Sequence, residues 1–280
     1  MDSQQLERLH VLPELFSKNN NKLLKEISLC IYGQFRSWDI NLKNNIKELN
    51  CLFENYKINI FILTDKQTCG NYSIENENKI KEIFLKLGCN ICFIKYIEDF
   101  DLSEEEEVAS YYDNNCKHSL GKNKFVPNLM YRKNLLNRLK NEYITLNNLN
   151  IYKHFYIRLF DMKIIKTNEL FSESIINNEI SGSGDSMHYG TKDAIDHLFN
   201  TNYKIYHDDI FDDTGFYNYY LNMDYCLCTL KHTYAPETQY AANIYYSSYK
   251  YINIRYDYNN PNNPNNKNTL FNIRHCQFRK

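Results

Sequence analysis

The sequence contains no long apolar run and no excess of charge of one sign. No stretch of the 280 residues approaches the roughly 20 apolar residues that a membrane-spanning helix needs. The first ten residues, MDSQQLERLH, have no apolar signal core. The 33 Lys and Arg nearly balance the 34 Asp and Glu, so the chain has no general field to hold a polyanion. We therefore expect no membrane span, no nucleic-acid partner and a cytoplasmic location.

The two common phosphate-binding fingerprints are also missing. There is no GxGxxG after the first apolar run and no GxxxxGK[ST] anywhere, which argues against a dinucleotide fold and a P-loop. The nine cysteines are an odd number in a chain expected in a reducing compartment, so free thiols are predicted. Cys226 and Cys228 lie in the apolar run YCLCTL, which is more typical of strand or core packing than of a zinc site.

The first half of the chain alternates buried strands with amphipathic helices. This order is the signature of a parallel sheet with right-handed crossovers, so an α/β fold with a Rossmann-like, mostly parallel central sheet flanked by helices is predicted. Strands are expected at 27–35, 58–63, 90–96 and 152–159, and helices at 39–53, 75–87 and 125–146.

The pattern becomes shorter and less regular after Asp161. A helix from Thr167 to about Asn177, a Gly-interrupted stretch at 180–189 and a helix capped by Thr191 are predicted there. We therefore expect a single domain of 280 residues. Residues 27–166 form its nucleotide-binding half, residues 167–257 its acceptor half, and residues 258–280 an Asn/Pro-rich loop and tail.

Polar residues follow the predicted strands where ligands of a parallel sheet bind. A glycine lets backbone approach a phosphate, an arginine can pair with it, and an aspartate can accept hydrogen bonds from a base or ribose. Simple turn chemistry is the alternative for each one. The predicted nucleotide-binding residues are Gly33, Gln34, Arg36, Thr64, Asp65, Arg132, Arg158 and Asp161.

Asp161 stands between the aromatic strand YKHFYIRL and the apolar run MKII. A carboxylate there can hold Mg²⁺ or Mn²⁺ across two phosphates, which neutralises a departing diphosphate. Capping of a turn, or pairing with Arg158, is the competing interpretation. The acidic cluster at 208–213 is instead predicted to be a solvated group at a helix start.

Five segments together resemble a family of GT-A type glycosyltransferases found in large DNA viruses and some microbes. They are ISLCIYGQFRSWD, NIFILTD, YIRLFDMKI, GSGDSMHYGTKDAIDHLF and APETQYA, and they span residues 27–245. The resemblance implies a GT-A-like fold and transfer of a sugar from a UDP- or GDP-linked donor to a hydroxyl, expected on a glycan. In that family an Arg-x-x-Asp segment stands in for the metal-binding Asp-x-Asp. If the source is viral, the host cytoplasm is the expected location.

The resemblance also implies roles for individual residues. Arg158 and Asp161 match the Arg-x-x-Asp element, although Asp161 is a lone aspartate where many such enzymes have two. Asp185 matches a residue facing sugar or acceptor, and Glu237 matches a Pro-Glu at a helix start. Ala235 replaces the usual histidine before that Pro-Glu, so the base role falls to Glu237 or Asp185. His275 is a second candidate metal ligand, and the predicted acceptor residues are His188, Tyr189 and Gln239.

Several alternatives stay open at this stage. An inverting enzyme needs a carboxylate to take the proton of the acceptor hydroxyl, whereas a retaining enzyme does not. The rival functions are a sugar-nucleotide-binding protein without transferase activity and a sugar nucleotidyltransferase. The second normally has a Gly-rich loop with a basic residue after the first strand, and GQFRSW matches that pattern poorly.

Overall fold

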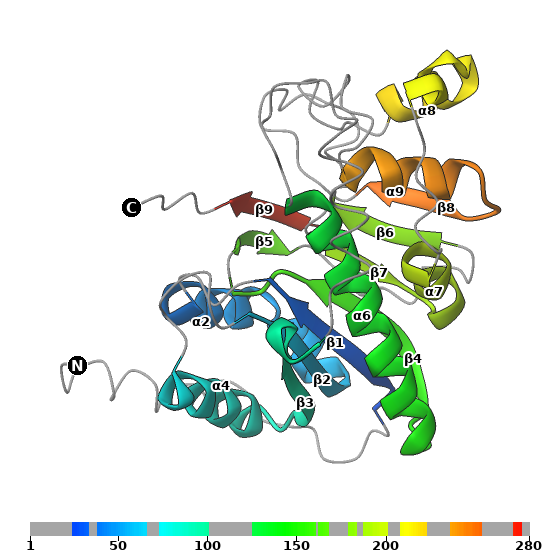
Figure 1. Cartoon of the computed structure of the whole chain (residues 1–280). Helices are drawn as coiled ribbons and strands as arrows, with labels where there is room; N and C mark the ends of the chain where they lie inside the picture. The colour runs from blue at the N-terminus through cyan, green and yellow to red at the C-terminus, as the bar shows by residue number, and fades with distance from the viewer. Residues whose placement is uncertain are drawn as a thin grey trace.

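A seven-stranded sheet forms the centre of the molecule, in the order β3-β2-β1-β4-β7-β6-β8 (Figure 1). This computed structural model describes residues 24–33, 38–65, 73–100, 125–160, 162–167, 179–183, 187–200, 208–222, 236–253 and 271–275. The strands of the sheet are β1 (Glu26–Tyr32), β2 (Lys57–Thr64), β3 (Asn90–Tyr96), β4 (Ile151–Ile157), β6 (Glu179–Ser183), β7 (Met187–Gly190) and β8 (Lys250–Asn253). A second sheet pairs β5 (Met162–Thr167) with β9 (Phe271–His275).

The large sheet is mostly parallel. Strand β1 pairs in parallel with β2 on one side and with β4 on the other, and β2 pairs in parallel with β3. Strand β7 is antiparallel to both neighbours, β4 and β6, while β6 and β8 are parallel. The predicted α/β fold with a mostly parallel, helix-flanked sheet is therefore confirmed.

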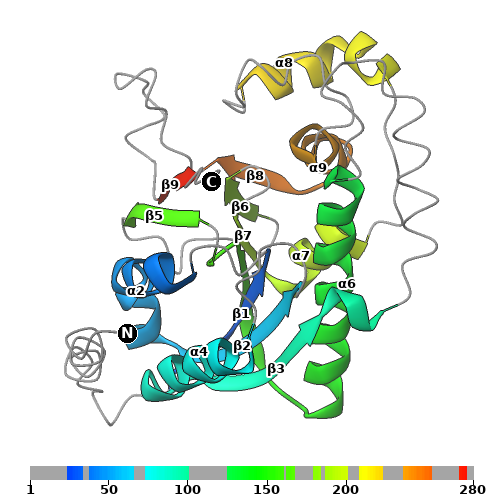
Figure 2. The same ribbon diagram turned by 60° about the vertical axis from the view of Figure 1, so that its left-hand side comes forward.

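Helices cover both faces of this sheet (Figure 2). One face carries α2 (Trp38–Glu48), α3 (Asn50–Asn55) and α4 (Ile74–Lys86). The other carries α6 (Phe125–Leu146), α7 (Lys192–Asn200) and α9 (Pro236–Tyr245). Alternate residues of a strand point to opposite faces, so Leu29 and Ile31 join the first core while Cys30 and Tyr32 join the second.

A third, smaller core forms between α8 (Thr214–Asn222), the 3-10 helix η3 (Asp208–Asp212) and α9. Asp213 begins α8 by accepting hydrogen bonds from the backbone N–H groups of Gly215 (2.8 Å) and Phe216 (3.1 Å). Asp209 and Asp212 are exposed. These described members of the acidic cluster fit the predicted solvated helix start.

Element boundaries agree closely with expectation where a segment is long and apolar. The bounds of β3 and α6 are those predicted, and the predicted helix at 39–53 is divided into α2 and α3. Thr167 is the last residue of strand β5, and residues 168–178, which hold the predicted helix, lie outside the described residues. A further short 3-10 helix, η2 (Ile97–Asp99), follows β3.

Two negative expectations concern membranes and disulfides. Within the described ranges, no helix has the length and apolar character needed to span a bilayer. Cys30, Cys89 and Cys92 are free thiols, and Cys30 and Cys89 are buried. Burial raises the pKa of the Cys30 thiol, which makes it a poor nucleophile.

Candidate functional site

The strand order reverses between β1 and β4, at the centre of the large sheet. From β1 the chain passes through β2 to β3 on one side, and α6 then returns it to β4 on the other side. Tyr32 is in register with Leu63, and Ile31 is in register with Ile157, so β1, β2 and β4 end at the same edge. Such a reversal leaves a crevice outside the carboxyl ends of the strands, where ligands of open α/β sheets bind.

Gly33 and Thr64 fix the conformation of the turn at this edge. Gly33 has φ 105°, a backbone conformation that favours glycine, and it follows the last residue of β1. The Thr64 hydroxyl donates a 2.7 Å hydrogen bond to the Gly33 carbonyl. The bond ties the end of β2 to the turn after β1, so the backbone of the turn is held in one place.

Asp65 and Arg132 form an ion pair across this edge. The distance from Arg132 Nη2 to Asp65 Oδ2 is 2.9 Å, and the side chains are only 14% and 5% exposed. Arg132 comes from α6, which covers the sheet face behind β1 and β2. The buried Nε of Arg132 has no hydrogen-bond partner among the described residues. The pair therefore places a carboxylate and a guanidinium beside Gly33. The Nε–H group of the guanidinium can still donate a hydrogen bond to a ligand.

Lys133, the next residue of α6, is fully buried in an aromatic enclosure. Its Nζ lies 5.0 Å from the ring centre of Tyr32, 4.5 Å from that of Tyr240 and 5.9 Å from that of Phe199. It also lies 3.4 Å from His188 Nε2. We call Lys133 and these four residues the Lys133 enclosure. It joins the end of β1 to α6, β7, α7 and the first turns of α9.

The tautomer of His188 follows from this contact. An ammonium can only donate, so Nε2 accepts and the ring proton is on Nδ1, a buried atom that has no hydrogen-bond partner in the described part of the chain. Burial, and then the positive charge of Lys133, hold the pKa of His188 well below its usual value. His188 is therefore neutral at physiological pH.

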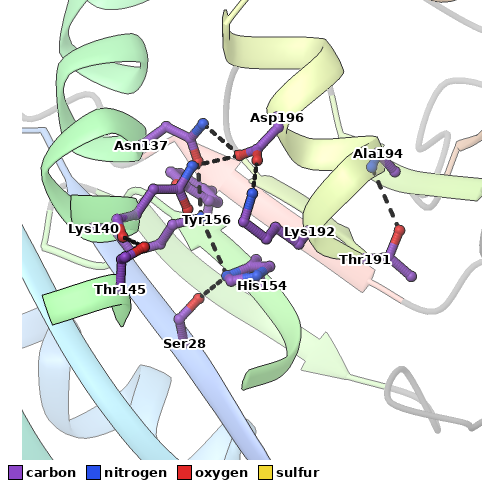
Figure 3. Close-up of polar contacts among 11 residues, drawn as sticks. Ser28, Asn137, Lys140, Thr145, His154, Tyr156, Thr191, Lys192, Ala194 and Asp196 are labelled. Atoms are coloured by element: carbon purple, nitrogen blue, oxygen red, sulfur yellow. Dashed lines mark hydrogen bonds and ion pairs between the residues drawn. The ribbon is translucent and has the colours of Figure 1, made fainter. Parts of the chain in front are cut away.

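A second buried lysine lies two turns further along α6 (Figure 3). Lys140 Nζ donates to Asn137 Oδ1 at 2.8 Å and to His154 Nδ1 at 3.2 Å, and the Ser28 hydroxyl lies 2.6 Å from the same His154 nitrogen. Burial is the main cause that lowers the pKa of Lys140 to about 8. We call this group the Lys140 network.

Asp196 of α7 completes the Lys140 network. Its Oδ1 accepts hydrogen bonds from Asn137 (2.8 Å) and Asn141 (2.7 Å), and its Oδ2 pairs with Lys192. These bonds lower the pKa of the carboxyl although its partial burial acts in the opposite direction. The network fastens α6 to α7 and to the inner strands, away from the Gly33 edge, and we assign it a structural role.

The small sheet begins one residue after the candidate metal ligand Asp161. Strands β5 and β9 are antiparallel, and Met162 is in register with His275. Directly opposed residues of such strands have Cα atoms about 4.5–5.5 Å apart. The backbone of Met162, the residue that follows Asp161 in the sequence, is therefore close to that of His275. The side chain of His275 and all of Asp161 lie outside the described residues.

The predicted site residues divide into four groups. Gly33, Thr64, Asp65 and Arg132 come together at one edge. His188 and Gln239 are fully buried, whereas Tyr189 packs against Phe155 on the opposite face of the sheet. Arg158 is half-buried just after β4, and Glu237 belongs to the first turn of α9 although its side chain is not described. Gln34, Arg36, Asp161 and Asp185 lie outside the described residues.

The sequence analysis missed the Lys133 enclosure and strand β9. Lys133, Asn137 and Lys140 recur at helical spacing, which can be read from the sequence, and the structure shows that all three are buried on α6. Among the residues that the structure describes, no group of three or more His, Cys, Asp or Glu is arranged to hold a metal ion.

No protein-family model, no curated protein and no solved structure matches this chain.

Proposed function

We propose that this protein is a GT-A type glycosyltransferase. It moves a sugar from a UDP- or GDP-linked donor to a hydroxyl group of a glycan acceptor, and Mn²⁺ or Mg²⁺ assists departure of the diphosphate. The proposal joins the sequence resemblance to the geometry of the β1/β4 edge.

The observation that carries the proposal is the group of polar residues at the switch point of the sheet, and the pairing of β5 with β9 supports it. Gly33 and the Asp65–Arg132 pair lie at the ends of β1 and β2. Strand β4 ends four positions before Asp161 in the sequence, and the β5–β9 register places Met162, the residue after Asp161, opposite His275. The switch point thus holds groups suited to a nucleotide, and we propose that the metal ligands Asp161 and His275 serve the same site.

The donor set at positions 161 and 275 fits the proposed metal. Carboxylate and imidazole are both ligands of Mn²⁺, and a carboxylate suits Mg²⁺. When bound, the ion would neutralise negative charge on the diphosphate leaving group. Asp161 and His275 are the residues that would hold it, and the register of β5 with β9 supports this pairing.

The chain's own residues account for the remaining steps. The Asp65 carboxylate can accept hydrogen bonds from a base or ribose, and Arg132 holds that carboxylate in place. Contacts of α9 with α6 bring the first turn of α9, which carries Glu237, towards the nucleotide half. In an inverting reaction Glu237, or Asp185 as the alternative, takes the proton of the acceptor hydroxyl as that oxygen attacks the anomeric carbon. In a retaining reaction neither is needed as a base.

Thermal unfolding with a panel of nucleoside diphosphates and their sugars tests the proposal. A ligand that binds only the native state at a hundred times its Kd adds about 2.7 kcal/mol of stability, which corresponds to about 5 °C or more in a protein of this size. We expect a hit among the uridine or guanosine diphosphates that is larger with Mn²⁺. Asp161→Ala should remove the metal-dependent part, whereas Asp209→Ala, an exposed control, should not.

Two activity assays distinguish the proposed function from the two rival functions. Hydrolysis or transfer of the donor sugar distinguishes an enzyme from a protein that only binds sugar nucleotides. Formation of a sugar nucleotide from a nucleoside triphosphate and a sugar phosphate would instead identify a nucleotidyltransferase. No shift with any diphosphate, with or without Mn²⁺, would reject the proposed function.

A further inference from the structure

Two buried asparagines of α2 hold the backbone just before Asp161. The side-chain amide of Asn45 donates a 2.7 Å hydrogen bond to the carbonyl of Leu159, and that of Asn41 donates a 3.1 Å bond to the carbonyl of Phe160. Both asparagines are buried, and so are the two residues that they hold. Because Leu159 and Phe160 are the last two residues before Asp161, the backbone that leads to the candidate metal ligand is fixed from α2. We call the two asparagines the asparagine clamp.

Helix α2 also links this segment to the turn after β1. It begins at Trp38, five residues after Gly33, and it packs against β5, which begins at Met162 (Figure 2). The clamp therefore fixes the connection between β4 and β5 relative to the helix that follows the Gly33 turn. In this way the backbone on either side of position 161 is held by the same element.

Packing of α2 alone does not require asparagine at these two positions. Asparagine is a poor helix former, and a buried polar side chain is costly unless it is hydrogen-bonded. Leu42 and Ile46 of the same helix already supply apolar contacts to the core that contains Leu159 and Phe160. The carbonyls that the clamp holds lie between β4 and β5, where no strand ladder satisfies them. The asparagines are thus matched to one particular course of this backbone.

A metal ligand needs this kind of support from residues around it. The ligating side chains of a functional site must be held within about 0.5 Å of their working geometry, and the residues that hold them are often buried and hydrogen-bonded. Partners that orient a ligand typically account for about ten- to hundredfold in metal affinity. The clamp also satisfies two buried carbonyls and so contributes to stability, and a role at the metal is therefore distinguished by metal affinity rather than by stability.

We propose that Asn41 and Asn45 are positioning residues that hold Asp161 in place for the divalent metal. This inference rests on the proposed function and adds two residues that neither the sequence resemblance nor the strand ends indicate. The asparagines act through the backbone of residues 159 and 160 and are not themselves metal ligands.

Asn59 provides a matched control for this role. It is also a fully buried asparagine, and its side-chain amide donates to Glu26 Oε2 at 2.9 Å while its oxygen accepts a hydrogen bond from Asn90. It lies near the start of β2, at the opposite end of the strands from the β1/β4 edge. Leucine at any of the three positions removes a buried donor and should lower stability, whereas only the two clamp variants should change the metal site.

Titration with Mn²⁺ in the presence of UDP or GDP tests the inference, with free Mn²⁺ followed by electron paramagnetic resonance. We expect Asn41→Leu and Asn45→Leu to weaken Mn²⁺ binding about tenfold or more, and to leave the affinity for the diphosphate without metal unchanged. Asn59→Leu should leave both affinities as they are in the wild type. All variants are titrated at a temperature at which circular dichroism shows them to be folded. Wild-type Mn²⁺ affinity in the two clamp variants, or an equal loss in Asn59→Leu, would overturn the inference.

A second measurement keeps the inference testable if the clamp variants do not fold. The side-chain amide signals of asparagine are assigned in wild-type protein labelled with ¹⁵N and ¹³C. Mg²⁺ added with the diphosphate should shift the signals of Asn41 and Asn45 and leave that of Asn59 in place, and unmoved clamp signals contradict the inference. If neither the diphosphates nor Mn²⁺ bind the wild type, the proposed function and this inference both fail. Mn²⁺ binding that Asp161→Ala abolishes and the clamp variants leave unchanged rejects only the inference.

Discussion

Replacement of Lys140 by methionine should change how the stability of the protein depends on pH. Burial lowers the pKa of Lys140 from 10.5 to about 8, and the side chain has no exposed surface. The unfolded chain therefore binds more protons than the native protein between pH 8 and 10.5, so this lysine makes the free energy of unfolding rise with pH across that window. Below pH 8 both states hold the proton, and the native state carries the full cost of the buried charge.

The size of this effect follows from the shift in pKa. Each unit corresponds to 1.36 kcal/mol, so the shift from 10.5 to about 8 amounts to about 3 kcal/mol. The difference in unfolding free energy between wild type and Lys140→Met should thus move by about 3 kcal/mol in favour of the wild type from pH 7.5 to 10.5. Methionine fills a similar volume and cannot titrate, and groups that do not interact with Lys140 cancel in the difference.

Urea unfolding followed by circular dichroism, under reducing conditions at several pH values, measures this difference. Lys192→Met is the control, because Lys192 pairs with the same Asp196 but its side chain is 52% exposed. Its curve should stay parallel to that of the wild type. If the Lys140→Met curve is also parallel across the window, the lysine is not held in a desolvated site and the reasoning is refuted.

Two further predictions concern the turn after β1 and the histidine of the Lys140 network. Gly33→Ala should lower the unfolding free energy by about 1–3 kcal/mol and weaken diphosphate binding, because alanine disfavours φ 105°. Urea-unfolding and diphosphate-titration curves identical to those of the wild type would contradict this prediction. His154→Gln should reduce acid sensitivity. Burial holds the pKa of His154 well below 6.5, so the unfolded state binds more protons than the native state below that pH. The wild type therefore loses stability as pH falls. If the unfolding free energies of both proteins change equally with pH, the prediction is wrong.

The parts of the fold that the sequence predicted best are those with a continuous local signal. β1 and β2 are buried on both faces, and β3 is mostly half-buried, but all three read as apolar runs. Helix α6 is long enough for its period to be clear. The sequence does not show the break between α2 and α3, because Leu49 continues the apolar spacing across it. Strand β9 has only five residues, and its partner β5 lies more than a hundred positions earlier in the chain.

Within the candidate site, the sequence predicted only the residues at the ends of the strands. Gly33, Thr64 and Asp65 follow apolar runs, and the rule for parallel sheets brings them together. Lysines on a helix are usually exposed, so the burial of Lys133 depends on tertiary contacts with Tyr32, His188 and Tyr240 that no local pattern shows. Tyr189 packs with Phe155 on the other face because neighbouring positions of a strand alternate.

Hydrogen–deuterium exchange on adding UDP or GDP with Mn²⁺ tests most directly whether the β1/β4 edge is the ligand site. The account predicts slower exchange in peptides that contain Gly33, Asp65 and the junction of β4 with β5, with little change at the opposite ends of these strands. Protection confined to other surfaces, or no protection under conditions that saturate binding, would contradict it.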